Sequence, residues 1–157
     1  VFAIIGINGM IIQGIMIGSL TKRFGSLNLM KFGTFTCGLG LVLVPYVSHQ
    51  YIWITMGIVV MLISTGNALF QPSFSAILAQ RTIDEGQEMG MVMGAQESAS
   101  AFARILGPLT GGLVWDFTVM KTGILSIATA FHLCGVMMAI ALFLQFRMKH
   151  ITAETSV

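Results

Sequence analysis

The chain has 157 residues, of which 55% are hydrophobic and only 9% are charged, and its mean hydropathy is +0.88. Soluble domains carry about 25% charged residues, so this composition excludes an ordinary soluble domain and indicates an integral membrane protein. The formal net charge of +2 is too small to indicate nucleic-acid binding, and the two cysteines lie in apolar segments and form no disulfide framework.

Five apolar segments follow one another along the chain, and each is long enough to form a membrane-spanning helix. About 20 helical residues cover the roughly 30 Å of the hydrocarbon core. The spans are expected over residues 1–20, 32–47, 51–80, 89–115 and 123–146. Together they predict an all-α, polytopic membrane helical bundle over residues 1–150, followed by a cytoplasmic tail over residues 151–157.

Short polar segments connect these spans, over residues 21–31, 48–50, 81–89 and 116–122. The polar segment from Arg147 onward is expected to be disordered. In the third span, Pro72 predicts a kink, because proline lacks a backbone donor and clashes with the preceding turn. The chain opens on apolar residues without a methionine or a basic flank, and we expect it to be a fragment that starts inside or just before a span.

The distribution of basic residues predicts the orientation of the bundle. With five spans, the first and third connections and the tail share one side of the membrane, which carries Lys22, Arg23, Lys31, Arg81, Arg147 and Lys149. The other side carries only Lys121, so the positive-inside rule places the basic connections and the C-terminus in the cytoplasm. An interfacial aromatic belt at the outer boundary is expected from Tyr46, Tyr51, Trp53 and Trp115.

The fourth span carries two charged residues, Glu97 and Arg104, inside a mostly apolar helix. Charges in lipid are costly and are expected to face protein or a water-filled cavity. On a helical projection, one sector holds the charged and small residues Gly90, Gly94, Glu97, Ala101, Arg104 and Pro108. The opposite sector holds Met91, Ala95, Phe102, Leu106, Leu109 and Leu113. This asymmetry predicts one lipid-facing side and one functional side.

Arg104 is the strongest functional candidate, because an arginine at the bilayer centre costs at least about 2.5–3.5 kcal/mol. The alternative is a structural ion pair with an acidic group elsewhere in the protein. Glu97 lies seven residues earlier, about 10 Å along the axis, so a water or substrate bridge is favoured over a direct bond. We hypothesise that the two charges set the local field for a charged substrate or a coupled proton.

Other polar residues within the spans have two readings. Asn8, Gln13 and Asn67 either line a cavity or form interhelical hydrogen bonds. His132 has a side chain that can titrate near neutral pH, but a packing histidine is favoured there. The sequence holds no metal-spaced His/Cys cluster, phosphate-binding loop or nucleophile elbow, so we expect no enzymatic activity and no cofactor.

The first connection reads Gly18-Ser19-Leu20-Thr21-Lys22-Arg23-Phe24-Gly25. It resembles motif A of the major facilitator superfamily, G-x-L-a-D-r-x-G, with Gly18, Lys22, Arg23 and Gly25 as the matching positions. Lys22 replaces the acidic residue, as is common in the weaker copy of the motif between the eighth and ninth helices. The match therefore implies the C-terminal half of such a protein.

The fourth span resembles motif C of the superfamily's antiporters, G-x8-G-x3-G-P-x2-G-G. The matching positions are Gly94, Ala103, Gly107, Pro108, Gly111 and Gly112, with Ala103 in place of the middle glycine. Glycines in membrane helices most often serve close packing, which is favoured here over ligand contact. The stretch from Pro72 through Gln96 to Pro108 resembles the tenth-to-eleventh helix region of drug:proton antiporters of the tetracycline-efflux group.

The resemblance covers nearly the whole chain, as helices eight to twelve of the fold. It implies a secondary transporter that exports small amphipathic compounds by alternating access, driven by protons, from the plasma or inner membrane. The implied partners are a small-molecule substrate, protons, the lipid bilayer and an N-terminal half of the same transporter. The pathway candidates are Asn8, Gln13, Asn67, Gln96, Glu97 and Arg104. The alternatives are an uptake carrier of the same superfamily, for sugars or organic acids, and a non-transporting multispan protein.

Overall fold

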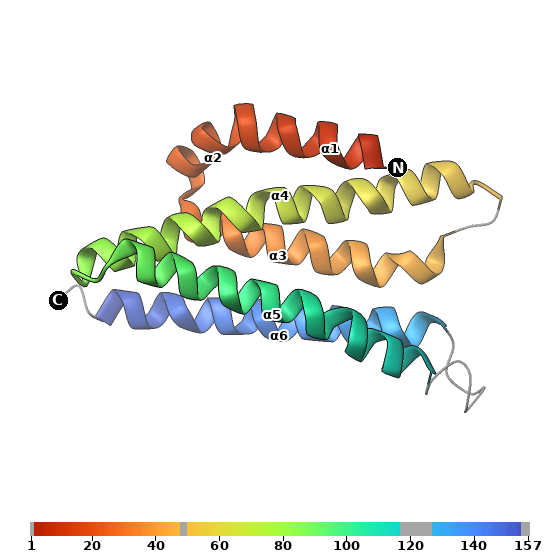
Figure 1. The fold of residues 1–157 in the computed structure, drawn as a ribbon. Coiled ribbons are helices and arrows are strands. Elements are labelled where there is room, and N and C mark those ends of the chain that lie inside the picture. Colours follow the sequence, from red (N-terminus) through yellow and green to blue (C-terminus); the bar gives the residue numbers. More distant parts are fainter. Residues whose placement is uncertain (1, 48–49, 117–126, 155–157) are drawn as a thin grey trace. The chain divides into compact units, whose positions relative to one another are not determined.

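The computed structural model describes residues 2–47, 50–116 and 127–154, and every regular element in these ranges is a helix, which confirms the predicted all-α class. Figure 1 shows the helices along the chain. They are α1 (Phe2–Ile11), the π-helical segment η1 (Ile12–Met16), α2 (Ile17–Phe24), α3 (Ser26–Leu43), the 3-10 turn η2 (Val44–Tyr46), α4 (Ile52–Asp84), α5 (Met89–Trp115) and α6 (Ile127–Glu154).

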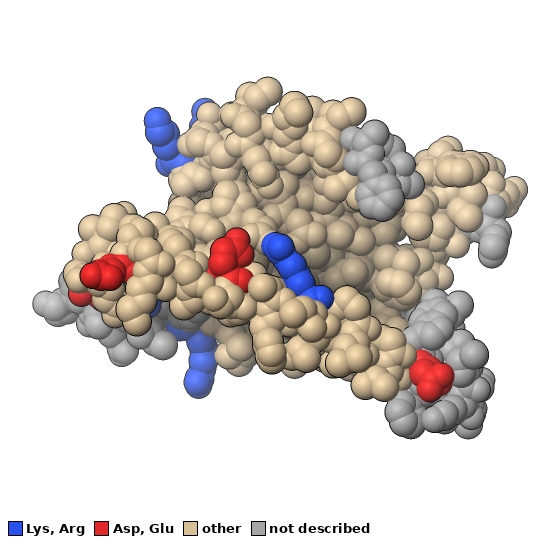
Figure 2. All heavy atoms as spheres, in the orientation of Figure 1, with Lys and Arg blue, Asp and Glu red and all other residues tan. Residues whose placement is uncertain are grey.

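Within the described residues, three helical stretches are long and apolar enough to cross a membrane. They are Ser26–Tyr46, Ile52–Asp84 and Ala130–Arg147. Figure 2 shows the charged side chains as separate spots on a surface that is otherwise uncharged, as expected of a membrane protein. The segments expected as the first and fourth spans are helical as well, but their crossing of the membrane stays a prediction.

The helices are grouped into two compact units. The first contains Val1–Phe74 and Phe131–Val157, and the second contains Ser75–Ala130. In the first unit, α1 bonds to α4 through Asn8 and Thr65, and α4 packs on α3. Beyond it, α3 packs on α6, where a Cβ on Gly38 would lie 3.1 Å from the Cβ of Met138.

Glycines set the close packing of α3 against α4. A Cβ on Gly33 would lie 2.8 Å from the carbonyl oxygen of Gly66, and a Cβ on Gly66 would lie 2.6 Å from the backbone nitrogen of Cys37. On the next turn, a Cβ on Gly40 would lie 2.6 Å from Cγ1 of Ile63. Small residues at such spacing let two membrane helices touch backbone to backbone, which gains dispersion energy where no hydrophobic effect operates.

A polar pair joins α3 to α6 inside the first unit. The Gln145 side chain is buried and its Nε2 donates to Oγ1 of Thr34 at 2.8 Å, while Thr34 donates to the carbonyl oxygen of Met30 at 3.0 Å. Nearby, the ammonium of Lys31 lies 4.3 Å from the ring centroid of Phe146, a cation–π contact. Lys31 is only 7% exposed, so it is a buried residue of α3 and not part of a connection.

The other end of α3 carries exposed aromatic residues. Tyr46, Tyr51 and Trp53 are 68%, 59% and 86% exposed around the connection to α4, where an interfacial belt is expected. The hydroxyl of Tyr46 is 3.3 Å from Nε2 of His132, and the two rings meet edge to face. His132 thus has a packing partner, as the favoured reading predicts.

Two predicted connections and the predicted disordered tail differ from the structure. The connection over residues 21–31 is wrong: α2 continues to Phe24, and Gly25 alone separates it from α3. Gly25 has a φ of +76°, which glycine adopts without steric cost, so one residue suffices to reverse the chain. The connection expected over residues 81–89 is shortened to residues 85–88, because α4 continues to Asp84. The disorder expected from Arg147 onward is also wrong up to Glu154, where α6 ends, and residues 155–157 lie outside the described residues.

Two other predicted connections lie mostly outside the described residues, namely Ser48 and His49, and residues 117–122. In α4 the helix is continuous through Pro72.

Candidate functional site

A groove between α1–η1 and α4 brings together two of the predicted pathway residues, Gln13 and Asn67. Ser64 and Gln71 complete its polar lining, and we call this groove the amide groove. The apolar part of the lining is Ile5, Gly9, Val60, Ile63 and Ala68. The groove has a volume of about 360 Å³, within the range of about 300–1,000 Å³ that is usual for small-molecule sites.

The helical repeat of α4 places three polar side chains on one face. Ser64, Asn67 and Gln71 are three and four residues apart, and this spacing puts them one above the other along the helix. Pro72 follows directly and has no N–H to donate to the carbonyl of Ala68, which lies in the groove lining. The groove therefore lies where a backbone carbonyl of α4 lacks its usual helical hydrogen-bond donor.

The π-helical segment supplies the fourth polar residue, Gln13. Within η1, the backbone N–H of Ile17 bonds to the carbonyl of Ile12, five residues earlier. Ile12 in this wide turn is buried, while Gln13, the next residue, lines the groove. Single π turns of this kind occur frequently at functional sites.

The three carboxamides of the groove have unused hydrogen-bonding capacity. Gln13, Asn67 and Gln71 are exposed, and none has a hydrogen-bond partner among the described residues. Each carboxamide offers a carbonyl acceptor and an N–H donor. In an apolar medium such a group without a partner costs about 2–7 kcal/mol, so these side chains need water or a polar ligand.

Asn8, by contrast, serves helix packing. Its Nδ2 donates to Oγ1 of Thr65 at 3.0 Å, and Oγ of Ser64 donates to the carbonyl oxygen of Ile5 at 3.3 Å. These two bonds fasten α1 to α4. Of the alternatives for the polar residues, cavity lining holds for Gln13 and Asn67, and both hold for Asn8, which also lines a third pocket between α1, α3 and α4.

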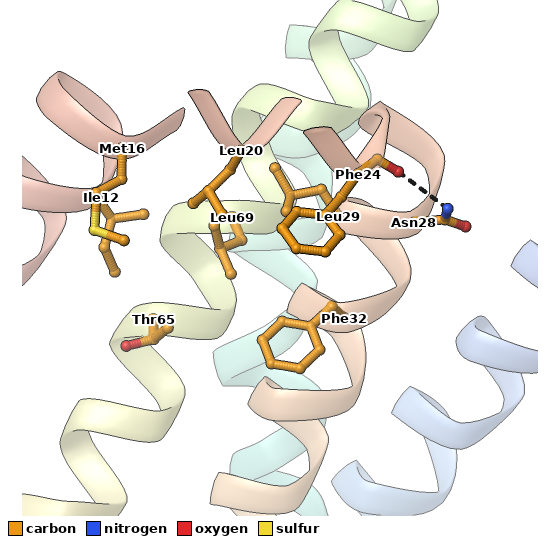
Figure 3. Close-up of a pocket in the computed structure, with 9 residues that line it drawn as sticks. All are labelled: Ile12, Met16, Leu20, Phe24, Asn28, Leu29, Phe32, Thr65 and Leu69. Carbon is orange, nitrogen blue, oxygen red and sulfur yellow. Dashed lines mark hydrogen bonds between the residues drawn. The ribbon is translucent and has the colours of Figure 1, made fainter. Parts of the chain in front are cut away.

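A second, apolar pocket of about 510 Å³ lies between η1–α2 and the α3–α4 pair (Figure 3). Two polar residues line it, and both already have partners. Asn28 donates from Nδ2 to the carbonyl oxygen of Phe24 at 3.0 Å, which satisfies a carbonyl at the end of α2, and Thr65 accepts from Asn8. The remaining lining is Ile12, Met16, Leu20, Phe24, Leu29, Phe32 and Leu69. This pocket therefore offers mainly apolar contact.

The other predicted pathway residues lie in the second unit, on α5. Gln96 donates from Nε2 to Oγ of Ser75 at 3.2 Å, which joins α5 to the end of α4, and its Oε1 is buried without a partner among the described residues. Glu97 and Arg104 are exposed, and no ion pair joins them or any other described residue to either side chain. The water or substrate bridge expected between Glu97 and Arg104 stays a prediction.

The motif C-like residues Gly94, Gly107, Gly111 and Gly112 have no described atom within 4 Å of an added Cβ. Ala103 and Pro108 are also exposed, and the helix is continuous through Pro108. Close packing of this face therefore stays a prediction. The glycines that do pack closely among the described residues are Gly33, Gly38 and Gly40 of α3, Gly66 of α4 and Gly135 of α6, which no motif marks. The spacing of Gly33, Cys37 and Gly40 was the available signal.

The motif A-like residues lie around the turn from α2 to α3. Lys22 and Arg23 are exposed in the last turn of α2, where cations favour the negative end of the helix dipole. Gly25 makes the turn through its positive φ, whereas Gly18 has open space around it. A close helix approach at Gly18 is not found among the described residues.

Fold and groove together describe an all-helical membrane protein with a polar, uncharged groove in its first unit. Among the described residues, no group of His, Cys, Asp or Glu side chains is placed to hold a metal ion. No family model, no curated protein and no solved structure matches the chain. Its function must therefore be inferred from the groove and the sequence pattern.

Proposed function

We propose that this chain is the C-terminal half of a secondary active transporter that exports small amphipathic compounds by proton-coupled alternating access. The amide groove is the observation that carries the proposal. Three unpartnered carboxamides within apolar helices are expensive in a bilayer unless they contact water or a substrate, and transport requires a polar path of this kind. The motif A-like and motif C-like segments support the same conclusion.

In this proposal the two units have different roles. The amide groove contributes to the substrate path, and Glu97 and Arg104 on α5 provide the charges that respond to proton movement. The glycine-bearing side of α5 faces a companion bundle, the N-terminal half, which supplies its close packing. Secondary transporters are commonly built from such repeats, with the substrate site between them.

The proposed orientation places the C-terminus in the cytoplasm of a plasma or inner membrane. Lys22 and Arg23 lie at one end of the first unit, near the turn between α2 and α3, and Arg147 lies near the C-terminal end of α6. Tyr46, Tyr51 and Trp53 lie around the opposite connection, between α3 and α4. Basic residues at the cytoplasmic side and aromatic residues at the interface support five spans in this orientation.

The test uses the complete protein encoded by the gene that contains these 157 residues. Inside-out vesicles are energised with a pH gradient, acid inside, and the accumulation of a fluorescent amphipathic dye is recorded. Export predicts accumulation that a protonophore abolishes. An uptake carrier would instead move a sugar or an organic acid in the inward direction, and a non-transporting protein would move neither.

A second, independent test is the sequence that precedes Val1. The transporter proposal requires an upstream set of helices with its own copy of motif A, related to this set as a repeat. A sequence without such a repeat contradicts both transporter readings and favours a non-transporting multispan protein.

A further inference from the structure

We infer that the amide groove binds a neutral ligand that carries both hydrogen-bond donors and acceptors, as a carboxamide or a hydroxyl-rich edge does. The inference rests on the proposed transport function for its biological meaning and names the chemical class of the substrate. The sequence alone favoured a charged substrate or a proton near Glu97 and Arg104. The groove leads to a different assignment for the substrate itself.

The lining determines the charge of the ligand. No lysine, arginine, aspartate or glutamate is among the nine residues that line the groove. An ion would leave water without a counter-charge, which is strongly unfavourable in an apolar environment. A neutral polar compound has no such penalty, and it relieves the cost of the unpartnered carboxamides when it binds.

The carboxamides determine its hydrogen-bonding pattern. Gln13 from η1 and Asn67 and Gln71 from α4 present both N–H donors and carbonyl acceptors to the same space. A site built to hydrogen-bond a ligand rejects analogues that lack the matching groups, because its own polar groups then stay unpaired. Ile5, Val60 and Ile63 add apolar contact, so the ligand is amphipathic.

Comparison with the apolar pocket supports this choice of site. There the polar side chains Asn28 and Thr65 each have a hydrogen bond within the protein, and the rest of the lining is apolar (Figure 3). In the amide groove the polar side chains of Gln13, Asn67 and Gln71 are unpartnered among the described residues. Selectivity between neutral polar compounds therefore arises in the groove.

The experiment measures binding, which needs no transport. The complete protein in lipid nanodiscs is mixed with three probes that share a ring and differ in charge: 2-naphthamide, 2-naphthoate and 2-naphthylmethylammonium. Ligand-observed saturation-transfer NMR reports binding, with empty nanodiscs subtracted. The inference predicts binding of the amide in clear preference to the anion and the cation. Equal binding of all three, or no binding of the amide, overturns it.

Variants locate the site. Asn67→Leu and Gln71→Met remove one carboxamide each and are expected to weaken amide binding about three- to tenfold, as the loss of a net hydrogen bond does. The matched control is Gln80→Met, the same replacement on α4 at an exposed residue that bonds to Asp84 outside the groove. Unchanged affinity in both groove variants overturns the inference.

A variant that introduces a charge distinguishes loss of the site from misfolding. Gln71→Glu places a carboxylate in the groove, and at mildly alkaline pH it is expected to gain binding of 2-naphthylmethylammonium, which unfolding cannot produce. Absence of this gain in a monodisperse sample overturns the inference.

If the complete protein exports only charged dyes and does not bind the amide, this inference fails and the transport proposal stands. If the amide binds and nothing is transported, the transport proposal fails and this inference stands.

Discussion

Gly33 and Gly66 bring α3 and α4 into backbone contact: a Cβ on Gly33 would lie 2.8 Å from the carbonyl oxygen of Gly66. A Cβ on Gly66 would in turn lie 2.7 Å from the carbonyl oxygen of Gly33. Both obstacles are backbone atoms, which cannot move aside as the end of a side chain can. This contact, which includes Cys37 of α3, fixes the distance between α3 and α4. Most of the residues that line the amide groove lie on α4.

Replacement of Gly66 by alanine is therefore expected to destabilise the protein by about 1–3 kcal/mol, the usual cost of overpacking a tight contact. Gly57→Ala is the matched control on the same helix, because an added Cβ there has no described atom within 4 Å. The measurement is unfolding in mixed detergent micelles, followed by circular dichroism. Equal stability of the two variants would contradict the packing described for α3 and α4.

The hydrogen bond between Gln145 and Thr34 is expected to couple α6 to α3. A double-mutant cycle with Gln145→Leu and Thr34→Val should give an interaction energy of about 0.5–2 kcal/mol, the range found for polar pairs between membrane helices. The cycle is measured with the same unfolding assay. Strict additivity of the two substitutions would mean that the 2.8 Å bond adds nothing to the docking of α6.

Arg104 is expected to be needed for proton-coupled transport. Arg104→Ala should lower dye export by the complete protein about tenfold or more and change its pH dependence, while Arg104→Lys retains the charge and part of the activity. Arg147→Ala serves as the control, because it removes the same side chain at the end of α6. Export and pH dependence that are intact in Arg104→Ala would remove this role.

The proposed orientation predicts which residues face the cytoplasm. A cysteine in place of Lys22 should react with a membrane-impermeant maleimide only in inside-out vesicles, and a cysteine in place of Trp53 only in right-side-out cells. Both positions are exposed, so the side of the membrane decides the reaction. The native Cys37 and Cys134 are first replaced by serine or alanine. Labelling of both positions from one side would exclude the proposed topology.

The sequence predicts the helices well because hydropathy and length act locally. The apolar segments after Lys31 and after Gln50 did form α3 and α4. The ends of the helices were less predictable. A charged residue such as Lys31 can lie within a helix when its ammonium contacts the ring of Phe146, which is distant in the sequence. Gly25 was part of the predicted motif, but nothing in the sequence indicated that it alone makes the turn.

The candidate site was predictable only in part. Gln13 and Asn67 were marked as polar residues within apolar segments, but periodicity does not reveal that they face one groove. Gln71 and Ser64 were not among the predicted pathway residues, although their spacing of four and three residues from Asn67 places them on the same face of the helix. The assignment of Asn8 to helix packing required the position of Thr65 on a helix far away in the sequence.

The wide turn at η1 also gives this chain an unusual tolerance to change. Because the segment from Ile12 to Met16 holds one residue more than a regular helical turn needs, loss of a single residue there would restore an ordinary helix while the residues before and after the turn keep their faces. Gln13 or its replacement would then turn toward another neighbour, while Gly25 and the helices after it keep their places. A one-residue deletion in this turn would therefore alter the polar lining of the amide groove and leave the surrounding helices in place.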